Sequence, residues 1–278
     1  MRVLLLLLLT VVPALGGNES RRPQDLVPDH GHLTYLDLLR QVIPDLAMVN
    51  GSAVGREVPE LNNPLGEDYD TVTPEVASIT DLESFSFRAQ GKRYLTILAS
   101  ITETSTPMDP VLLALYEDGP APKLVDAIDI SLDRFTSFYL DSEPVLSLGN
   151  NDELLATVST HGNSNQSYAS YLILIARDGR FQVVDHINTL SETVCDGMRE
   201  QSVNFASTLS GDPYWAFRVT VVEVAKPPSD ASCIEPGADF GPYQKDYEVR
   251  YTWDAATQRF VPDSDLFDEL ADLNAARY

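Results

Sequence analysis

The chain has 278 residues and a net charge of −23, from 42 acidic and 19 basic residues, and 44% of its residues are hydrophobic. This apolar fraction excludes a disordered chain, and the twelve Tyr and ten Phe favour extensive β-sheet. The negative charge repels nucleic acid and anionic membrane surfaces, so neither is an expected partner.

The first sixteen residues have the pattern of a secretory signal peptide. Met1 and Arg2 form a short basic end, and residues 3–12 are almost entirely apolar. Ala14-Leu15-Gly16 then supplies small residues at the two positions that a signal peptidase reads. The apolar run is too short for a membrane span. We expect cleavage at Gly16/Gly17 and a mature protein that is secreted or periplasmic, without a membrane anchor.

The N-terminal region of the mature chain, residues 17–80, is expected to hold one helix and a long acidic connection. Residues 33–43 repeat apolar side chains at helical spacing, and Thr34 can cap this helix with an acid three residues further on. Pro44 disfavours helical geometry in the residue before it and ends the helix there. Residues 50–74 are rich in Gly, Pro, Asn and acid, which indicates a loop in which a short strand is hidden.

From residue 81 to residue 278 the pattern predicts a β-rich domain built from about three meander units, because apolar and polar residues alternate. The expected strands of the three units are 94–101, 111–116 and 123–130, then 153–160, 168–176 and 181–187, then 215–224, 247–253 and 259–261. Asp-Gly pairs at 118–119 and 178–179 predict tight hairpin turns. Further strands are expected at 134–140, 144–148 and 203–208.

The chain closes on an amphipathic helix predicted over residues 265–277, in which leucines share one face. Asp263 or Ser264 is the expected N-cap, and acids fill the first turn as the helix dipole favours. The predicted fold class is therefore mainly β, with short N- and C-terminal helices. Its antiparallel meander sheets form either propeller-like blades or a large sandwich. The sequence leaves two alternatives open: the three units are true repeats, or they are ordinary hairpins that resemble one another by convergence.

The chain has two cysteines, Cys195 and Cys233, and both lie in the part predicted to be exported. In an oxidising compartment an even pair most simply forms one disulfide. Metal binding or redox chemistry is the weaker alternative, because there is no CxxC motif and no His beside either cysteine. We expect a structural disulfide.

The most distinctive polar stretch joins two predicted strands at residues 161–168. It combines imidazole, amide and phenol groups, which supply hydrogen-bond donors, acceptors and an aromatic plane. The candidate binding residues are His161, Asn163, Asn165, Gln166 and Tyr168. Such a set suits a sugar, a peptide backbone or another polar ligand. The alternative is an ordinary hairpin loop in which Asn and Gly supply the turn geometry.

A catalytic interpretation would centre on His161 and on the Asp185-His186 pair. Together with Ser159 or Ser167, these residues have the types needed for a base, an orienting acid and a nucleophile. No GxSxG elbow and no SxxK motif supports that interpretation. An Asp or His at a strand end more often bonds to nearby backbone or to solvent, so no catalytic residue is assigned.

Candidate metal ligands occur without matching a metal motif. His30-Gly31-His32 offers two imidazoles to a transition metal, but no clear third ligand accompanies them. Oxygen-rich clusters that suit Ca²⁺ lie at 67–70, 150–153 and 263–265, and none matches an EF-hand loop. No metal site is assigned, and no cofactor other than Ca²⁺ is considered.

The leading hypothesis is an exported, non-catalytic binding or interaction protein. Its partner would be a protein or a polar or carbohydrate ligand outside the cytoplasm. One alternative is a secreted hydrolase that acts on a polar substrate through His161 or Asp185-His186. The other is an acidic inhibitor of a basic secreted enzyme, which the net charge motivates.

Overall fold

The computed structural model describes residues 20–66, 73–101, 110–132, 135–139, 145–149, 152–211, 213–234 and 240–277. The predicted signal peptide, residues 1–16, and the acidic cluster at 67–70 lie outside these ranges. Within them, no helix is both long enough and apolar enough to cross a membrane.

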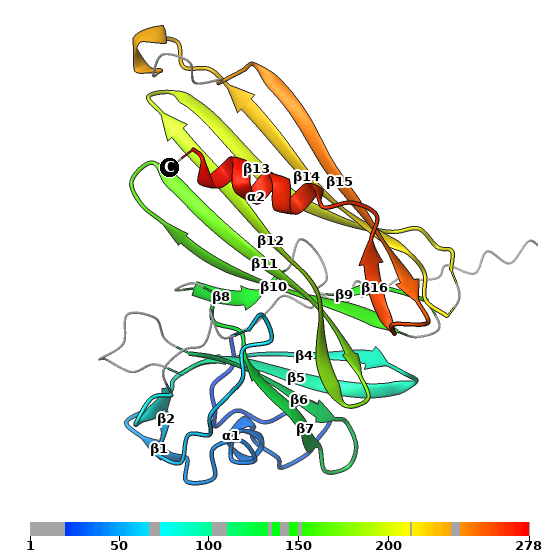
Figure 1. Cartoon of the computed structure of the whole chain (residues 1–278). Coiled ribbons are helices and arrows are strands. Elements are labelled where there is room, and N and C mark those ends of the chain that lie inside the picture. The colour runs from blue at the N-terminus through cyan, green and yellow to red at the C-terminus, as the bar shows by residue number, and fades with distance from the viewer. Residues whose placement is uncertain are drawn as a thin grey trace, which may run out of the picture.

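The fold is mainly β and consists of three antiparallel sheets (Figure 1). The smallest contains β1 (Ala47–Val49), β2 (Ser52–Gly55) and β3 (Ala77–Ile79). The second contains β4 (Glu83–Ala89), β5 (Lys92–Ser100), β6 (Val111–Glu117) and β7 (Lys123–Asp129). The third contains β8 (Phe135–Phe138), β9 (Val145–Ser147), β10 (Glu153–Gly162), β11 (Gln166–Arg177), β12 (Arg180–Val194), β13 (Gly197–Ser207), β14 (Phe217–Lys226), β15 (Tyr243–Asp254) and β16 (Arg259–Pro262).

The three predicted meander units correspond to β5–β7, β10–β12 and β14–β16. The first unit lies in the four-stranded sheet, with β4 at its edge. The second and third belong to one continuous nine-stranded sheet, in which consecutive strands from β10 to β16 pair with each other. These two units are therefore successive meanders of one sheet rather than blades of a propeller. The further strands expected from the sequence are also present, as β8, β9 and β13.

Two of the hairpins in these sheets are joined by two-residue turns. Asp178 and Gly179 join β11 to β12 with φ values of 52° and 74°, the left-handed geometry of a two-residue hairpin turn. Gln90 and Gly91 join β4 to β5 in the same way, with φ values of 51° and 73°. At Asp118 the predicted tight turn is wrong, because β6 ends at Glu117 and β7 begins at Lys123.

Both predicted helices form, but their boundaries differ from the prediction. Helix α1 (Tyr35–Leu39) has the expected capping box from Thr34, yet it ends four residues before Ile43. Helix α2 (Leu266–Ala275) begins after Asp265, whose side chain makes no capping hydrogen bond. The predicted caps Asp263 and Ser264 are wrong; the Asp263 carboxylate instead accepts a hydrogen bond from the backbone of Arg250 at 3.0 Å.

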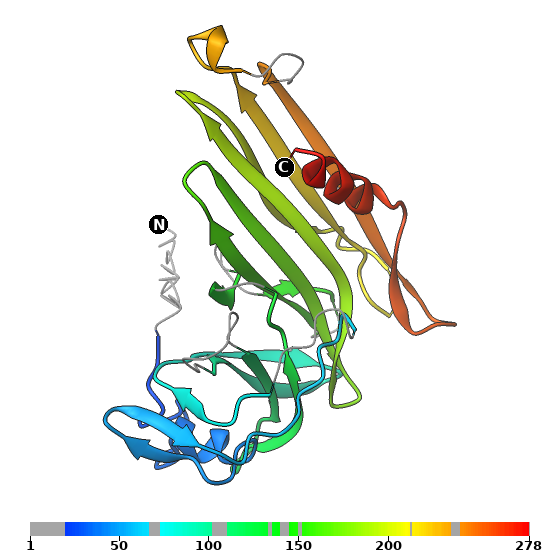
Figure 2. The same ribbon diagram turned by 60° about the vertical axis from the view of Figure 1, so that its left-hand side comes forward.

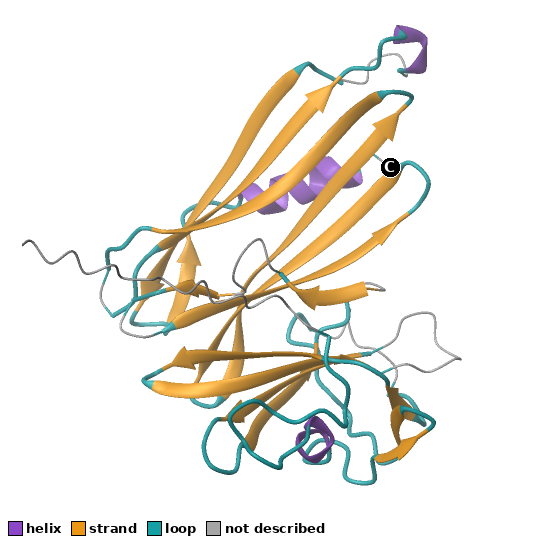
Figure 3. Ribbon diagram, turned by 180° about the vertical axis from the view of Figure 1, so that it is seen from behind, coloured by secondary structure: helices purple, strands orange, loops and turns teal. Residues whose placement is uncertain are grey.

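Four hydrophobic clusters hold the sheets together. One packs α1 against the two smaller sheets through buried residues such as Leu38, Ile79 and Tyr116. Two others join β10 and β11 to the four-stranded sheet, where the β11–β12 hairpin reaches down to it (Figure 2). The fourth lies on the nine-stranded sheet and includes Phe267 and Leu270 of α2. Seen from behind, α2 lies beyond the strands, so it covers one face of that sheet (Figure 3).

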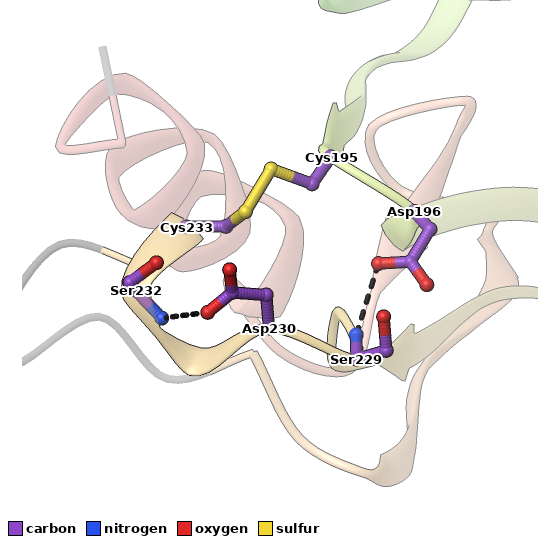
Figure 4. Close-up of a disulfide and its surroundings, with 6 residues drawn as sticks. All are labelled: Cys195, Asp196, Ser229, Asp230, Ser232 and Cys233. Atoms are coloured by element: carbon purple, nitrogen blue, oxygen red, sulfur yellow. Dashed lines mark hydrogen bonds between the residues drawn. A yellow bond between two sulfur atoms is a disulfide. The ribbon is translucent and has the colours of Figure 1, made fainter.

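The predicted disulfide between Cys195 and Cys233 is confirmed (Figure 4). It ties the β12–β13 turn to the short helix η2 (Ala231–Cys233) in the connection between β14 and β15. A second contact between the same segments is the hydrogen bond that Ser229 N donates to Asp196 Oδ1 at 2.9 Å. The tip of the large sheet is therefore fixed by one covalent bond and by a neighbouring hydrogen bond.

The nine-stranded sheet is split between β12 and β13. These long strands pair through three residue pairs next to their turn, Glu192 with Arg199, Thr193 with Met198 and Val194 with Gly197. Further along, Leu190 N donates to Gln201 Oε1 at 2.9 Å, and Gln201 N donates to Ser191 Oγ at 3.2 Å. Side chains thus replace the backbone ladder and satisfy polar groups that the split would otherwise leave unbonded.

Candidate binding groove

The β10–β11 hairpin carries all five predicted binding residues, but they have different roles. Asn163 Oδ1 accepts hydrogen bonds from the backbone N–H groups of Asn165 at 3.0 Å and Gln166 at 2.9 Å, so it builds the turn. Gln166 Oε1 accepts a hydrogen bond from the Tyr168 hydroxyl. His161 and Tyr168 lie opposite each other in the register, with ring centroids 5.2 Å apart. The hairpin-loop alternative therefore describes Asn163 well, while the two rings are available to line a surface.

A groove of about 370 Å³ lies beside this hairpin. Its lining residues come from β8, β10, β11, β12 and β13, namely Phe135, Thr160, His161, Gly162, Ser167, Tyr168, Ala169, Tyr171, Thr189, Ser191 and Gln201. The structure thus brings His161 and Tyr168 together with residues that sequence reasoning missed. Asn163, Asn165 and Gln166 are not in its lining.

Aromatic rings and hydroxyl groups dominate the groove. Phe135, on the short edge strand β8, is 71% exposed and presents its ring to the groove. Ser191 Oγ accepts a hydrogen bond from Gln201 N, and its own proton remains available to a ligand. Thr189 Oγ1 donates to Ala169 O at 3.2 Å and keeps its lone pairs as acceptors.

Gln201 forms a wall of the groove rather than a ligand-binding group. Its Oε1 accepts hydrogen bonds from Leu190 N and from Asn274 Nδ2, both at 2.9 Å. Its Nε2 donates to Glu223 and to Asn274 Oδ1. The amide has thereby used its hydrogen-bonding capacity within the protein, and it fixes β12, β13, β14 and α2 around the groove.

A buried charged network continues from Gln201 beneath α2. Glu223 is fully buried and accepts hydrogen bonds from Arg277 Nη1 at 2.7 Å, from Arg277 Nη2 at 3.2 Å and from Tyr243 Oη at 2.9 Å. Burial by itself would raise the pKa of Glu223, but the hydrogen bonds from Arg277, Gln201 and Tyr243 outweigh it and hold this pKa below its ordinary value. Arg199 extends the network, since it pairs with Glu192 and donates to Tyr243.

The residues of the catalytic alternative do not assemble. His161 pairs with Tyr168, whereas Asp185 pairs with Ile173, five residues further along β11. At the rise of a β-strand this separates them by roughly 17 Å. Asp185 instead accepts a hydrogen bond from the Tyr251 hydroxyl.

Burial dominates the electrostatics of the Asp185-His186 pair. It raises the pKa of Asp185 above its ordinary value, although the Tyr251 hydrogen bond opposes this, and it lowers the pKa of His186. Of the two serines considered, Ser159 is buried and hydrogen-bonded with Thr136 at 2.8 Å. The Asp185-His186 pair is thus partly buried and is not among the residues that line the groove.

Several of the candidate metal ligands have other partners in the structure, and residues 150 and 151 of one predicted Ca²⁺ cluster lie outside the described ranges. His30 Nε2 lies 3.0 Å from Asp118 Oδ1, and Arg93 forms an ion pair with the same carboxylate at 2.9 Å. Asp152 and Glu153 accept hydrogen bonds from backbone N–H groups of Gln90 and Arg88. Among the described residues, no group of three or more His, Cys, Asp or Glu is arranged to hold a metal ion.

Comparisons of the chain with known protein families, with curated proteins and with solved structures find no match. The chemistry of the groove therefore has to be inferred from its own residues.

Proposed function

We propose that this protein is an exported, non-catalytic binding protein whose groove takes an uncharged, hydroxyl-rich ligand, with a neutral oligosaccharide as the best fit. The observation that carries the proposal is the lining of the groove. Phe135 and Tyr168 offer aromatic surfaces, the largely buried Tyr171 adds to the lining, and Thr160, Ser167 and Ser191 offer hydroxyl groups beside them. Concave sites that combine apolar surface with a few placed polar groups are typical of small-molecule binding.

The charge of the groove supports an uncharged ligand. Among the described residues that line it, none is Asp, Glu, Lys or Arg, although 22% of the chain is charged. A charged ligand would lose hydration on entering the groove without gaining an ion pair, which is unfavourable. A sugar keeps its hydrogen bonds by exchanging water for the hydroxyl groups of the groove.

Two features support export. The first sixteen residues have the signal-peptide pattern described above. The Cys195–Cys233 disulfide is also typical of proteins in oxidising compartments outside the cytoplasm. Export fits the two alternative functions equally well, but the separation of His161 and Asp185 in the register counts against the hydrolase.

The groove is tested by titrating the mature protein with a panel of soluble neutral oligosaccharides, from glucans and from mannans, in a calorimeter. For a sugar that binds, we expect Phe135→Ala and Tyr168→Ala each to weaken binding about tenfold, because each removes an aromatic contact. Leu209→Ala is the matched control, since Leu209 is 70% exposed and is not among the residues that line the groove.

Unchanged affinity in both groove variants would show that a bound sugar sits elsewhere. If none of the panel binds the wild-type protein, the proposal of a neutral oligosaccharide ligand fails.

A further inference from the structure

A second cavity, of about 700 Å³, lies where the four-stranded sheet meets the β11–β12 turn. Its lining residues are Gln90, Lys92, Tyr94, Glu117, Lys123, Leu124, Val125, Asp178, Gly179 and Arg180. They share no residue with the groove. The cavity continues outward from the hydrophobic cluster that joins the two sheets through Phe87, Tyr94 and Ala176.

Tyr94 places an unbonded hydroxyl group in this cavity. The residue is 2% exposed, and its ring packs against Phe87 with centroids 5.9 Å apart. Its hydroxyl makes no hydrogen bond to any residue within the described ranges. The hydroxyl is not one of the enclosed polar atoms that lack a partner, so it is reachable from the cavity and can donate to an acceptor placed there. Burial raises the pKa of Tyr94, which keeps the phenol protonated and able to donate.

Two cations line the cavity without a counter-ion in the described part of the chain. The side chains of Lys123 and Arg180 are exposed and form no ion pair there. The third cation, Lys92, lies 2.9 Å from Glu117 and is neutralised by it. The cavity thus holds two of the four lysines of a strongly acidic chain, together with one arginine.

The turn at the rim is held in a fixed position. Gln90 Nε2 donates to Asp178 Oδ1 at 3.1 Å, and Asp178 N donates to Gln90 Oε1 at 2.7 Å. These two bonds fasten the β4–β5 turn to the β11–β12 turn and engage the Asp178 carboxylate. Among the lining residues, three are cationic (Lys92, Lys123 and Arg180) and two are anionic (Glu117 and Asp178), which leaves one positive charge in excess. The side chains of Leu124 and Val125 add partly buried apolar surface.

We propose that this cavity binds an organic anion with an aromatic or aliphatic body. The body packs against Leu124, Val125 and the ring of Tyr94. The anionic group accepts hydrogen bonds from the Tyr94 hydroxyl and from Lys123 and Arg180, which are stronger when the acceptor is charged. This site is independent of the groove and of the function proposed for it. Because the chain as a whole is acidic, selectivity comes from these three donors at short range, while salt screens the more distant negative charges.

The test uses anilinonaphthalene sulfonate, a monoanion with an aromatic body whose fluorescence rises when it leaves water. We expect saturable binding to the folded wild-type protein. Tyr94→Phe, which keeps the ring, and the double variant Lys123→Gln/Arg180→Gln should each weaken it about tenfold. The double variant Arg218→Gln/Lys226→Gln is the matched control, because it removes the same two charges from the nine-stranded sheet.

The proposal is overturned if the probe does not bind saturably, or if Tyr94→Phe and Lys123→Gln/Arg180→Gln bind it as tightly as the wild type. It is also overturned if the control double variant loses as much affinity, since net charge would then explain the result. A loss of binding in Phe135→Ala instead would place the probe in the groove. Each variant is first checked for a wild-type melting temperature and circular dichroism spectrum, so that loss of fold is not mistaken for loss of the site.

Discussion

Replacing both cysteines with serine is expected to lower the free energy of unfolding by about 4 kcal/mol. The disulfide closes a loop between residues 38 apart in the sequence, and the chain-entropy model gives this value for a loop of that length. The effect should be large here because the bond joins the β12–β13 turn to the β14–β15 connection. These strands lie at the split side of the nine-stranded sheet, where the backbone ladder between β12 and β13 is short.

Urea unfolding of the wild type and of Cys195→Ser/Cys233→Ser measures this difference. The wild type in excess reductant should match the double variant, because both lack the cross-link. The chain-entropy account fails if the oxidised wild type and the reduced wild type give the same unfolding curve. Ser229→Ala/Ser232→Ala serves as a neighbouring control, in which the disulfide and the backbone hydrogen bonds of that loop are retained.

The features that the sequence predicts well are those encoded over a few neighbouring residues. Alternation of apolar and polar residues locates the strands of all three units, and Asp178-Gly179 supplies the turn geometry that joins β11 to β12. The disulfide follows from the even number of cysteines together with the predicted export of the chain. The N-cap of α1 is also encoded locally, since Thr34 caps this helix as expected. The N-cap of α2 is not, because Asp263 accepts a hydrogen bond from the backbone of Arg250 instead of capping the helix.

The groove could not be predicted because it depends on the split between β12 and β13. Thr189, Ser191 and Gln201 look like ordinary strand residues in the sequence, and they face a common space only because the strands diverge after Glu192 and Arg199. A regular ladder would have given no such space. The hairpin residues His161 and Tyr168 were within reach of sequence reasoning, because they are close together in the chain.

The buried charge of Glu223, in contrast, had a signal that sequence reasoning missed. Val219, Val221 and Glu223 alternate along β14 and share one face. An acid in an otherwise apolar series implies a buried partner, because an unpaired charge in the core is very unfavourable. What the sequence could not give is the identity of that partner, Arg277, which lies 54 residues further along the chain.

Replacing Glu223 with Gln is expected to destabilise the protein by about 3 kcal/mol or more, because it leaves Arg277 facing a buried, uncharged amide. Gln keeps nearly the same volume, so cavity formation contributes little. The matched control is Glu248→Gln on β15, whose half-exposed carboxylate lies 3.6 Å from Arg218. Because solvent screens that surface pair, we expect the control to cost less than about 1 kcal/mol in the same urea experiment.

The pH dependence of the unfolding free energy shows whether the charge of Glu223, rather than the volume of its side chain, stabilises the fold. Hydrogen bonds hold its folded-state pKa below the ordinary value of 4.5, so its ionised form stabilises the fold. That contribution is fully present above about pH 4.5 and is lost as the pH falls through the folded-state pKa.

Asp185 acts in the opposite sense, because its raised pKa makes the fold less stable as the pH rises above the ordinary value. The wild type contains both effects, whereas Glu223→Gln retains that of Asp185. The stability difference between the two proteins should therefore shrink as the pH is lowered below 4.5, and a difference that stays constant to pH 3 would mean that the charge of Glu223 contributes nothing.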